Sequence, residues 1–233
     1  MRKLTKSLVL IVWNELQGCK TDIPLLPREG FDEVFAIDGG SSDGTVEYLQ
    51  SQGIQVHRQS RRSLNAAYAE AVDLAISEAV VVFFPKGTIA PSTVAQLAAG
   101  IDAGADLVVA SRNLSGAHNE EDDHVLKPRK WGVSLLSLSA AILWRREGWR
   151  IRDVLHGVKA FTVAAYRRMQ IADTGVTIDL EMAVRAYRLR IPRIEIPVVE
   201  NARAHGQTHF RIWPTGKKLA RFLAKELFHT LKQ

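Results

Sequence analysis

Residues 37–45 read IDGGSSDGT, and they join an apolar strand-like run to a stretch with helical spacing. The run ends at Asp38, the two glycines that follow permit a tight backbone path, and Ser42 or Asp43 can cap the helix. An acidic side chain at this point can accept hydrogen bonds from a base or a ribose, while backbone N–H groups face the ligand. Glycine, serine and aspartate are also common in ordinary turns. The segment therefore indicates either a ligand-binding loop or a plain β–α turn.

The first half of the chain alternates short apolar runs with helical patterns. The runs are rich in Val, Ile and Phe and cover residues 8–13, 33–37, 54–57, 79–84 and 107–110. Apolar residues recur at helical spacing over residues 43–50, 63–77 and 92–103. This alternation predicts right-handed β–α–β crossovers and an α/β fold, with a mostly parallel sheet flanked by helices. Ligands of such sheets bind beyond the carboxyl ends of the strands, so the residues that directly follow each strand matter most.

The second half of the chain has longer helical segments. Its polar stretch over residues 113–124 predicts a loop, and the elements expected after it are helices over 127–152, 179–190 and 215–232 and strands over 158–161 and 193–196. The length of 233 residues suits one domain. We expect residues 1–210 to form this domain. Residues 211–233 are expected to form a basic amphipathic helix, in the same domain or as an appendage at a membrane surface.

Composition limits the partners of the chain. The formal net charge of +6 and the pI near 9.6 predict an anionic partner such as an acidic lipid or a phosphorylated small molecule. Nucleic acid is not expected, because no RNA- or DNA-binding motif accompanies the charge. The single cysteine, Cys19, excludes an intramolecular disulfide and suits a reducing cytoplasm. We expect no signal peptide, because Met1–Lys6 leads into only about seven apolar residues. We expect no spanning helix, since no uncharged apolar run reaches about 20 residues.

Residues 38–45 resemble the Asp-Asp-Gly-Ser-Ser-Asp-Gly-Thr signature of the family 2 glycosyltransferases, with Gly39 in place of the second aspartate. Residues 13–15, Trp-Asn-Glu, are similar to the Tyr-Asn-Glu that ends the first strand in that family. The resemblance implies the GT-A fold, a Rossmann-like α/β arrangement, and a nucleotide-sugar donor. It implies that the donor is held by Trp13, Asn14, Glu15, Asp38 and Asp43.

Later motifs resemble the dolichol-phosphate mannosyltransferase-like branch of the family, in the same order and over about residues 8–210 in all. They are Ser111-Arg112, residues 153–161 (DVLHGVKAF), residues 179–181 (DLE) and residues 203–208 (RAHGQT). The resemblance implies a polyprenyl phosphate or another membrane-proximal acceptor. It implies that Asp153 orients the acceptor or acts as the base, and that the acceptor or its phosphate is contacted by Arg112, Lys159, Asp179, Glu181, Arg203 and His205. A helix cap is the alternative role for the two carboxylates of residues 179–181. Surface solubility or ordinary ion pairs are the alternative for Arg112, Lys159 and Arg203, and a structural hydrogen bond is the alternative for His205.

The resemblance breaks at the metal site. Family members usually carry Asp-x-Asp after the fourth strand, where it binds Mg²⁺ or Mn²⁺, and alignment on Pro91 places residues 84–86, Phe-Pro-Lys, at that position. Neither a phenylalanine nor a lysine can replace a carboxylate ligand of a hard cation. No metal cofactor is therefore expected, although Asp43 or residues 118–124 could supply an unusual site. Either Lys86 provides the positive charge for the diphosphate, or the site has lost catalysis.

Two stretches suggest contact with a membrane surface. Residues 131–144 are uncharged, begin and end with tryptophan, and are flanked by basic residues. This pattern is typical of a helix that lies in the headgroup region. The last helix repeats it with an apolar face of Leu219, Phe222, Leu223, Leu227 and Leu231 among lysines and arginines. The alternative is that both helices pack on their own protein or form a dimer contact.

Together these patterns favour an enzyme that moves a sugar from a nucleotide-sugar to a polyprenyl phosphate or another membrane-proximal acceptor. Such an enzyme would work in the cytoplasm, peripherally at the inner face of the membrane. A catalytically silent glycosyltransferase-like protein that binds a nucleotide or a lipid is the second hypothesis. A nucleotidyltransferase on a similar sheet is a third. The sequence indicates neither the sugar, the base nor the oligomeric state.

Overall fold

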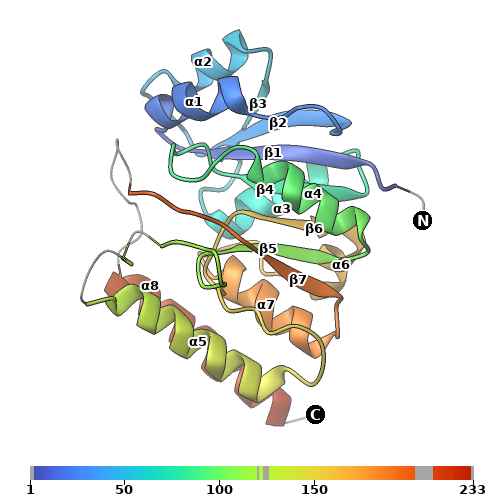
Figure 1. Ribbon diagram of the computed structural model, residues 1–233, viewed down its shortest axis with the longest axis vertical. Coiled ribbons are helices and arrows are strands. Elements are labelled where there is room, and N and C mark those ends of the chain that lie inside the picture. Colours follow the sequence, from blue (N-terminus) through green and yellow to red (C-terminus); the bar gives the residue numbers. More distant parts are fainter. Residues whose placement is uncertain (1–2, 120, 123–125, 203–211, 232–233) are drawn as a thin grey trace.

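The computed structural model describes residues 3–119, 121–122, 126–202 and 212–231. Within them, seven strands form one sheet in the order β3-β2-β1-β4-β6-β5-β7 (Figure 1). The strands are β1 (Lys6–Val12), β2 (Glu33–Asp38), β3 (Gln55–Arg58), β4 (Ala79–Phe83), β5 (Leu107–Ser111), β6 (Lys159–Thr162) and β7 (Arg193–Pro197). All run in one direction except β6, which pairs antiparallel with β4 and β5. The expected mostly parallel sheet is confirmed.

Helices cover both faces of the sheet, because successive strand side chains point to opposite sides. Val9, Val80 and Val109 face a core that α3 (Leu64–Leu74), α5 (Pro128–Trp144), α6 (Val163–Met169), α7 (Ile178–Arg188) and α8 (Ile212–Leu231) complete. Leu8, Val81 and Val108 face a second core with α1 (Leu16–Asp22), α2 (Thr45–Ser51) and α4 (Thr93–Asp102). The strands β1, β4 and β5 are buried along their whole length. Their apolar runs therefore lack the polar alternation of a half-exposed strand.

The element boundaries agree with the sequence-based predictions to within one to three residues except at three places. The predicted helix over 127–152 is wrong at its end, because α5 stops at Trp144. Arg145 is extended there, and Gly148 has a φ of 70° that ordinary residues avoid. The side chain of Arg193 fixes the following turn by donating to the carbonyls of Glu147 and Trp149. The sequence patterns missed α1 and α6, which have seven residues each and are too short to show a helical period.

The last helix packs on the domain. Leu219 is buried in the core, and Phe222, Leu223 and Leu227 lie against it. Glu226 is buried and pairs with Arg185 and Arg188 of α7 at 2.8 and 2.7 Å. The side chain of Leu231 lies outside the described residues. Over its described length, the apolar face that was predicted to meet a membrane therefore packs against the protein's own core. This agrees with the alternative hypothesis, in which the helix packs on its own protein. No helix in the described ranges has the length and hydropathy that crossing a bilayer requires.

Candidate active site

The loops that follow β1 and β2 are joined by hydrogen bonds. The carboxylate of Asp38 accepts from the N–H groups of Gly40 and Ser41 at 2.9 and 3.0 Å. The side-chain oxygen of Asn14 accepts from Ser42 N–H at 2.8 Å, and the Asn14 N–H donates to the Ser41 hydroxyl at 2.8 Å. Asn14 holds a positive φ of 53°, which asparagine tolerates better than most residues. The two motifs that the sequence singled out therefore form one hydrogen-bonded unit.

Asp43 and Glu15 belong to the same unit. The carboxylate of Asp43 accepts from Leu16 N–H at 3.1 Å, at the start of α1, and from the N–H and hydroxyl of Thr45. The Thr45 hydroxyl in turn accepts from Glu15 N–H at 3.0 Å. Burial raises the pKa of Asp43, but the hydrogen bonds from Thr45 and Leu16 outweigh it, so that the pKa is lowered overall. Asp43 is thus an ionised carboxylate that orders the loop, and its contact with a nucleotide stays a prediction.

Trp13 directly follows the end of β1 and is half-buried. The guanidinium of Arg62 lies 4.0 Å from the centre of its ring, a cation–π contact. A Cβ added at Gly39 would lie 3.2 Å from the Cβ of Trp13, tighter than most real contacts. Glycine at position 39, where the resembled signature has aspartate, therefore accommodates the tryptophan. Sequence reasoning missed Arg62 because nothing in the pattern places it beside Trp13.

The turn after β4 is held against α1. The ring of Phe84 packs over Gly157, where an added Cβ would lie 2.7 Å from the ring, and the ammonium of Lys86 lies 4.8 Å from the ring centre. A Cβ at Gly18 of α1 would collide with the carbonyl oxygen of Pro85. The buried carboxylate of Asp22 accepts from Gly87 N–H at 2.8 Å. Gly18 and Asp22, which sequence reasoning missed, therefore fix the position of Lys86.

The side chains that follow β4 do not suit a divalent cation. Phe84, Pro85 and Lys86 offer no side-chain oxygen, and a hard cation requires oxygen ligands. The carboxylate of Asp43 already accepts three hydrogen bonds within its own loop. Nowhere in the described ranges do three or more His, Cys, Asp or Glu side chains gather in a way that could hold a metal ion. Residues 118–124, the other metal candidate, lie partly outside these ranges.

Replacing Asp22 with asparagine is expected to change how stability depends on pH. Burial raises the pKa of Asp22 from 3.8 to about 6, against the effect of the Gly87 and Lys86 N–H groups. Between these two pKa values the folded protein keeps the Asp22 proton, whereas the unfolded chain has released it. The free energy of unfolding therefore decreases as the pH rises from about 4 to 6. Urea unfolding should show wild type losing stability relative to Asp22→Asn over that interval. A difference between the two proteins that stays constant with pH would refute the assignment.

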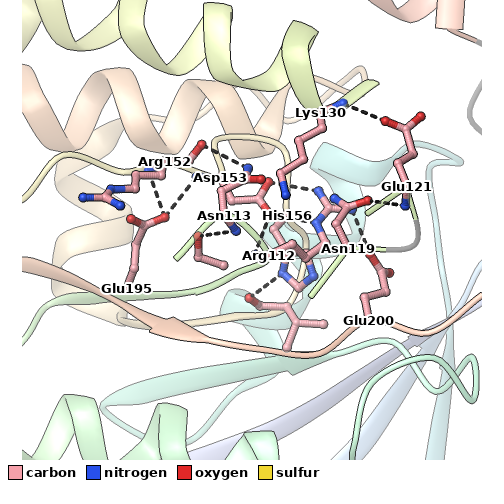
Figure 2. A network of polar contacts seen from close by, with 12 residues as sticks. Arg112, Asn113, Asn119, Glu121, Lys130, Arg152, Asp153, His156, Glu195 and Glu200 are labelled. Atoms are coloured by element: carbon pink, nitrogen blue, oxygen red, sulfur yellow. Dashed lines mark hydrogen bonds and ion pairs between the residues drawn. The ribbon is translucent and has the colours of Figure 1, made fainter. Parts of the chain in front are cut away.

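A buried ionic network follows β5 (Figure 2). Arg112 holds Asp153 through two bonds, Nε to Oδ2 at 2.7 Å and Nη2 to Oδ1 at 2.9 Å. Its third donor, Nη1, reaches Glu200 at 2.8 Å. Glu195 accepts from the backbone N–H groups of Arg152 and Asp153 at 2.8 and 3.0 Å. Sequence reasoning missed Glu195 and Glu200, which carry no local signal because their partners are far away in the chain.

The electrostatics of this network limit what Asp153 can do. Burial raises its pKa, but the Arg112 guanidinium outweighs that effect and lowers the pKa to about 2. The His156 imidazole has a lowered pKa because of burial and the nearby Arg112 charge, so it is neutral at pH 7. Asp153 is therefore ionised, with both oxygens occupied, and can accept a proton only after Arg112 moves. The structure places Arg112 between two carboxylates, and its expected phosphate contact stays a prediction.

The remaining predicted residues form a second buried group. Lys159, 2% exposed, starts β6 opposite the end of β4 and pairs with Asp179. The carboxylate of Glu181 accepts from Ala172 N–H at 3.1 Å, and Asn65 reaches it from α3 at 3.4 Å. Asp179 and Glu181 lie in the first turn of α7. Their roles toward an acceptor stay predictions, as do those of Arg203 and His205, which lie outside the described residues.

Six strands in one direction, interrupted by antiparallel β6, with loops gathered at their carboxyl ends, define a GT-A domain. The fold is similar to that of glucosyl-3-phosphoglycerate synthase from Mycobacterium tuberculosis solved with Mn²⁺ and UDP-glucose, at a TM-score of 0.68 and 19% identity over 96% of this chain and 78% of that one. The same enzyme in complex with Mg²⁺ and UDP gives 0.62 and 18%, over 98% of this chain and 78% of that one.

Residues 9–174 match the model of the family described as glycosyl transferase family 2, and the chain belongs to this family. It is 28% identical to glycosyltransferase AglJ of Haloferax volcanii over 83% of this chain and 62% of the relative. It is 24% identical to polyprenol monophosphomannose synthase of Mycolicibacterium smegmatis over 74% of this chain and 68% of the relative. The chain thus spans about two thirds of the length of these two relatives.

Proposed function

We propose that this domain transfers a sugar from a nucleotide-sugar to a polyprenyl phosphate, and that it binds the diphosphate through Lys86 in place of a divalent metal. The observation that carries the proposal is the placement of two loops, each held by hydrogen bonds, on either side of β1. Asp38 ends β2, Lys86 follows β4, and β1 pairs with both strands. Neighbouring strands lie about 4.8 Å apart, so β2 and β4 lie about 10 Å apart across β1, a span that suits a nucleoside diphosphate.

The donor side follows from this placement. The nucleoside is held by Trp13, Asn14, Glu15, Asp38 and Asp43. The ring of Trp13 provides an aromatic surface, and the guanidinium of Arg62 lies over this ring. The Lys86 ammonium pairs with the diphosphate as a point charge, and Gly18 and Asp22 hold the backbone that carries it. The structural neighbour solved with UDP-glucose supports a nucleotide-sugar donor. That neighbour was solved with Mn²⁺, a cation to which Phe84, Pro85 and Lys86 offer no side-chain oxygen.

On the acceptor side, a phosphate monoester is already ionised and needs no strong base. One of its oxygens forms a bond to the anomeric carbon as the bond from that carbon to the donor diphosphate breaks, and the nucleoside diphosphate leaves. Asp153 orients the acceptor, Arg112, Lys159 and Arg203 hold its phosphate, and Asp179, Glu181 and His205 contact the acceptor. The relative named polyprenol monophosphomannose synthase supports a polyprenyl phosphate. Such an acceptor places the protein at the inner face of a membrane as a peripheral enzyme.

A direct assay tests the proposal. The protein is incubated with a short-chain polyprenyl phosphate and a panel of UDP- and GDP-sugars in EDTA, and products are identified by mass spectrometry. The expected product is a glycosyl phosphoryl polyprenol formed from one donor of the panel. Added Mn²⁺ should change the rate by no more than about twofold, since Phe84, Pro85 and Lys86 offer the ion no side-chain oxygen. The second candidate is a catalytically silent nucleotide-binding protein. It is favoured by the ion pairs of Arg112 and Lys159, because these cations already have carboxylate partners and do not need an acceptor phosphate. Binding of a nucleotide without any product would support it and reject the transferase.

A further inference from the structure

One face of α5 carries large apolar side chains that no other part of the described chain covers. Trp131, Leu135, Leu138 and Ile142 are 57%, 66%, 44% and 67% exposed. They are spaced by four, three and four residues, so they line one side of the helix over about 16 Å. We call these four residues the outer face of α5. Single exposed apolar side chains are ordinary, but a continuous row of four marks a contact surface.

The outer face is not required to hold the helix in place. The opposite side of α5 is anchored by Val133, Ala140, Ala141 and Trp144, all buried in the core. The buried hydroxyl of Ser137 donates to the carbonyl oxygen of Ile151 at 2.6 Å and adds a polar tie on that side. The helix would therefore be stable with a polar outer face. The apolar residues there serve contact with something outside the domain.

Charge indicates what that contact is. The helix contains no acidic residue, and residues 145–152 after it contain four arginines and one glutamate. Arg145 and Arg146 are exposed, and so is Trp149 at 66%. At the other end, Lys127 and Lys130 surround Asp122. An apolar row with exposed arginines beyond its carboxyl end and tryptophan at its borders matches the headgroup region of an anionic bilayer.

A second copy of the chain fits this face less well. In a two-fold dimer of antiparallel α5 helices, the arginines after Trp144 of one copy would approach the lysines before Trp131 of the other. In a parallel arrangement the arginines would meet each other. The parallel arrangement brings like charges together at the border of an apolar contact, which opposes association. In the antiparallel arrangement the arginines would meet lysines that already pair with Asp122, and light scattering tests this case.

We infer that the outer face of α5 is the surface with which this protein docks on an anionic membrane. The inference rests on the proposed function, because a polyprenyl phosphate presents its phosphate at headgroup level. The first turn of α5 is tied to the site by its backbone: Lys130 N–H donates to Glu121 at 2.9 Å, and Glu121 N–H donates to Asn119 at 3.0 Å. Figure 2 shows Lys130 and Glu121 beside the cluster of Arg112, Asp153 and Glu200. Docking through α5 therefore brings this cluster close to the headgroups.

Vesicle sedimentation tests the docking surface. The full chain is mixed with vesicles of phosphatidylcholine alone or with an equal share of phosphatidylglycerol. Wild type should sediment with the anionic vesicles, and high salt should weaken this. The double variant Leu135→Glu/Ile142→Glu should bind them at least about 10-fold more weakly, since two charges would enter the interface. The matched control is Ile76→Glu, which alters an isoleucine that is 81% exposed and lies after α3. It should bind as wild type does.

Other results would overturn the inference. Equal binding by wild type and the double variant, or no binding by wild type, rejects the outer face as a docking surface. Light scattering after gel filtration decides about a second copy: a wild-type dimer that the double variant converts to a monomer, with no vesicle binding, would assign the face to self-association. Nucleotide binding without vesicles is measured in parallel. It should be unchanged in the double variant, so failure of docking is distinguishable from failure of the proposed transferase.

Discussion

Replacing Asp153 with asparagine is expected to lower the free energy of unfolding by about 3 kcal/mol, the lower end of the range for breaking a buried ion pair. The carboxylate is 1% exposed and accepts both a two-bond contact from Arg112 and the backbone N–H of Arg112 at 3.1 Å. The asparagine leaves Arg112 with one carboxylate, Glu200, and a buried cation that is only half compensated. The effect is at the lower end because Glu200 remains.

The matched control is Glu200→Gln. It removes the other partner of Arg112, but Glu200 is 20% exposed and makes a single bond, so a loss of about 1 kcal/mol or less is expected. Urea unfolding at pH 7 measures both. The pH provides a second check, because the pKa of Asp153 is lowered from 3.8 to about 2. The wild-type advantage should be complete above about pH 4 and be lost as the pH falls through 2. Equal losses for the two variants would contradict the account.

Replacing Lys86 with alanine is expected to weaken binding of the nucleoside diphosphate by about 10- to 100-fold in EDTA. A charge-assisted bond to a phosphate contributes about 1.5–3 kcal/mol, and no carboxylate-bound metal would compensate for it. The variant Lys86→Arg keeps the charge and should retain most of the affinity. Calorimetric titration with UDP and GDP measures both.

The Lys86 variants also separate charge from shape. Alanine removes the contact of the ammonium with the Phe84 ring, but Gly18 and Asp22 still hold the turn through its backbone. The melting temperature without nucleotide should therefore change little. If Lys86→Ala binds nucleotide as tightly as wild type, Lys86 has no part in holding the diphosphate.

Local sequence patterns predicted much of the fold. Apolar runs gave the strands, since a buried parallel strand is apolar along its length, and the glycines and Asp38 marked the loop after β2. The joined loops of Asn14 and Ser42 were indicated by two separate motifs that the parallel pairing of β1 and β2 brings together. Family resemblance implied roles for Arg112 and Asp153 in acceptor binding. It did not show that they pair with each other.

The rest depends on contacts between distant parts of the chain. Glu195 in β7 accepts from the backbone of Asp153, and Glu200 after β7 accepts from Arg112. No local sequence pattern predicts contacts between residues so far apart in the chain. The two amphipathic helices looked alike in sequence. Their packing differs. The described apolar face of α8 completes the core, whereas α5 has apolar residues on two sides, one buried in the core and one exposed.

Thermal unfolding with a panel of nucleoside diphosphates and nucleotide-sugars, each in EDTA and in Mn²⁺, tests the central claim most directly. The account predicts that one base raises the melting temperature, and that the rise in EDTA equals the rise in Mn²⁺. A rise that requires Mn²⁺ would contradict the claim that Lys86 replaces the metal. No rise with any nucleotide under either condition would contradict the claim that this site binds a nucleotide.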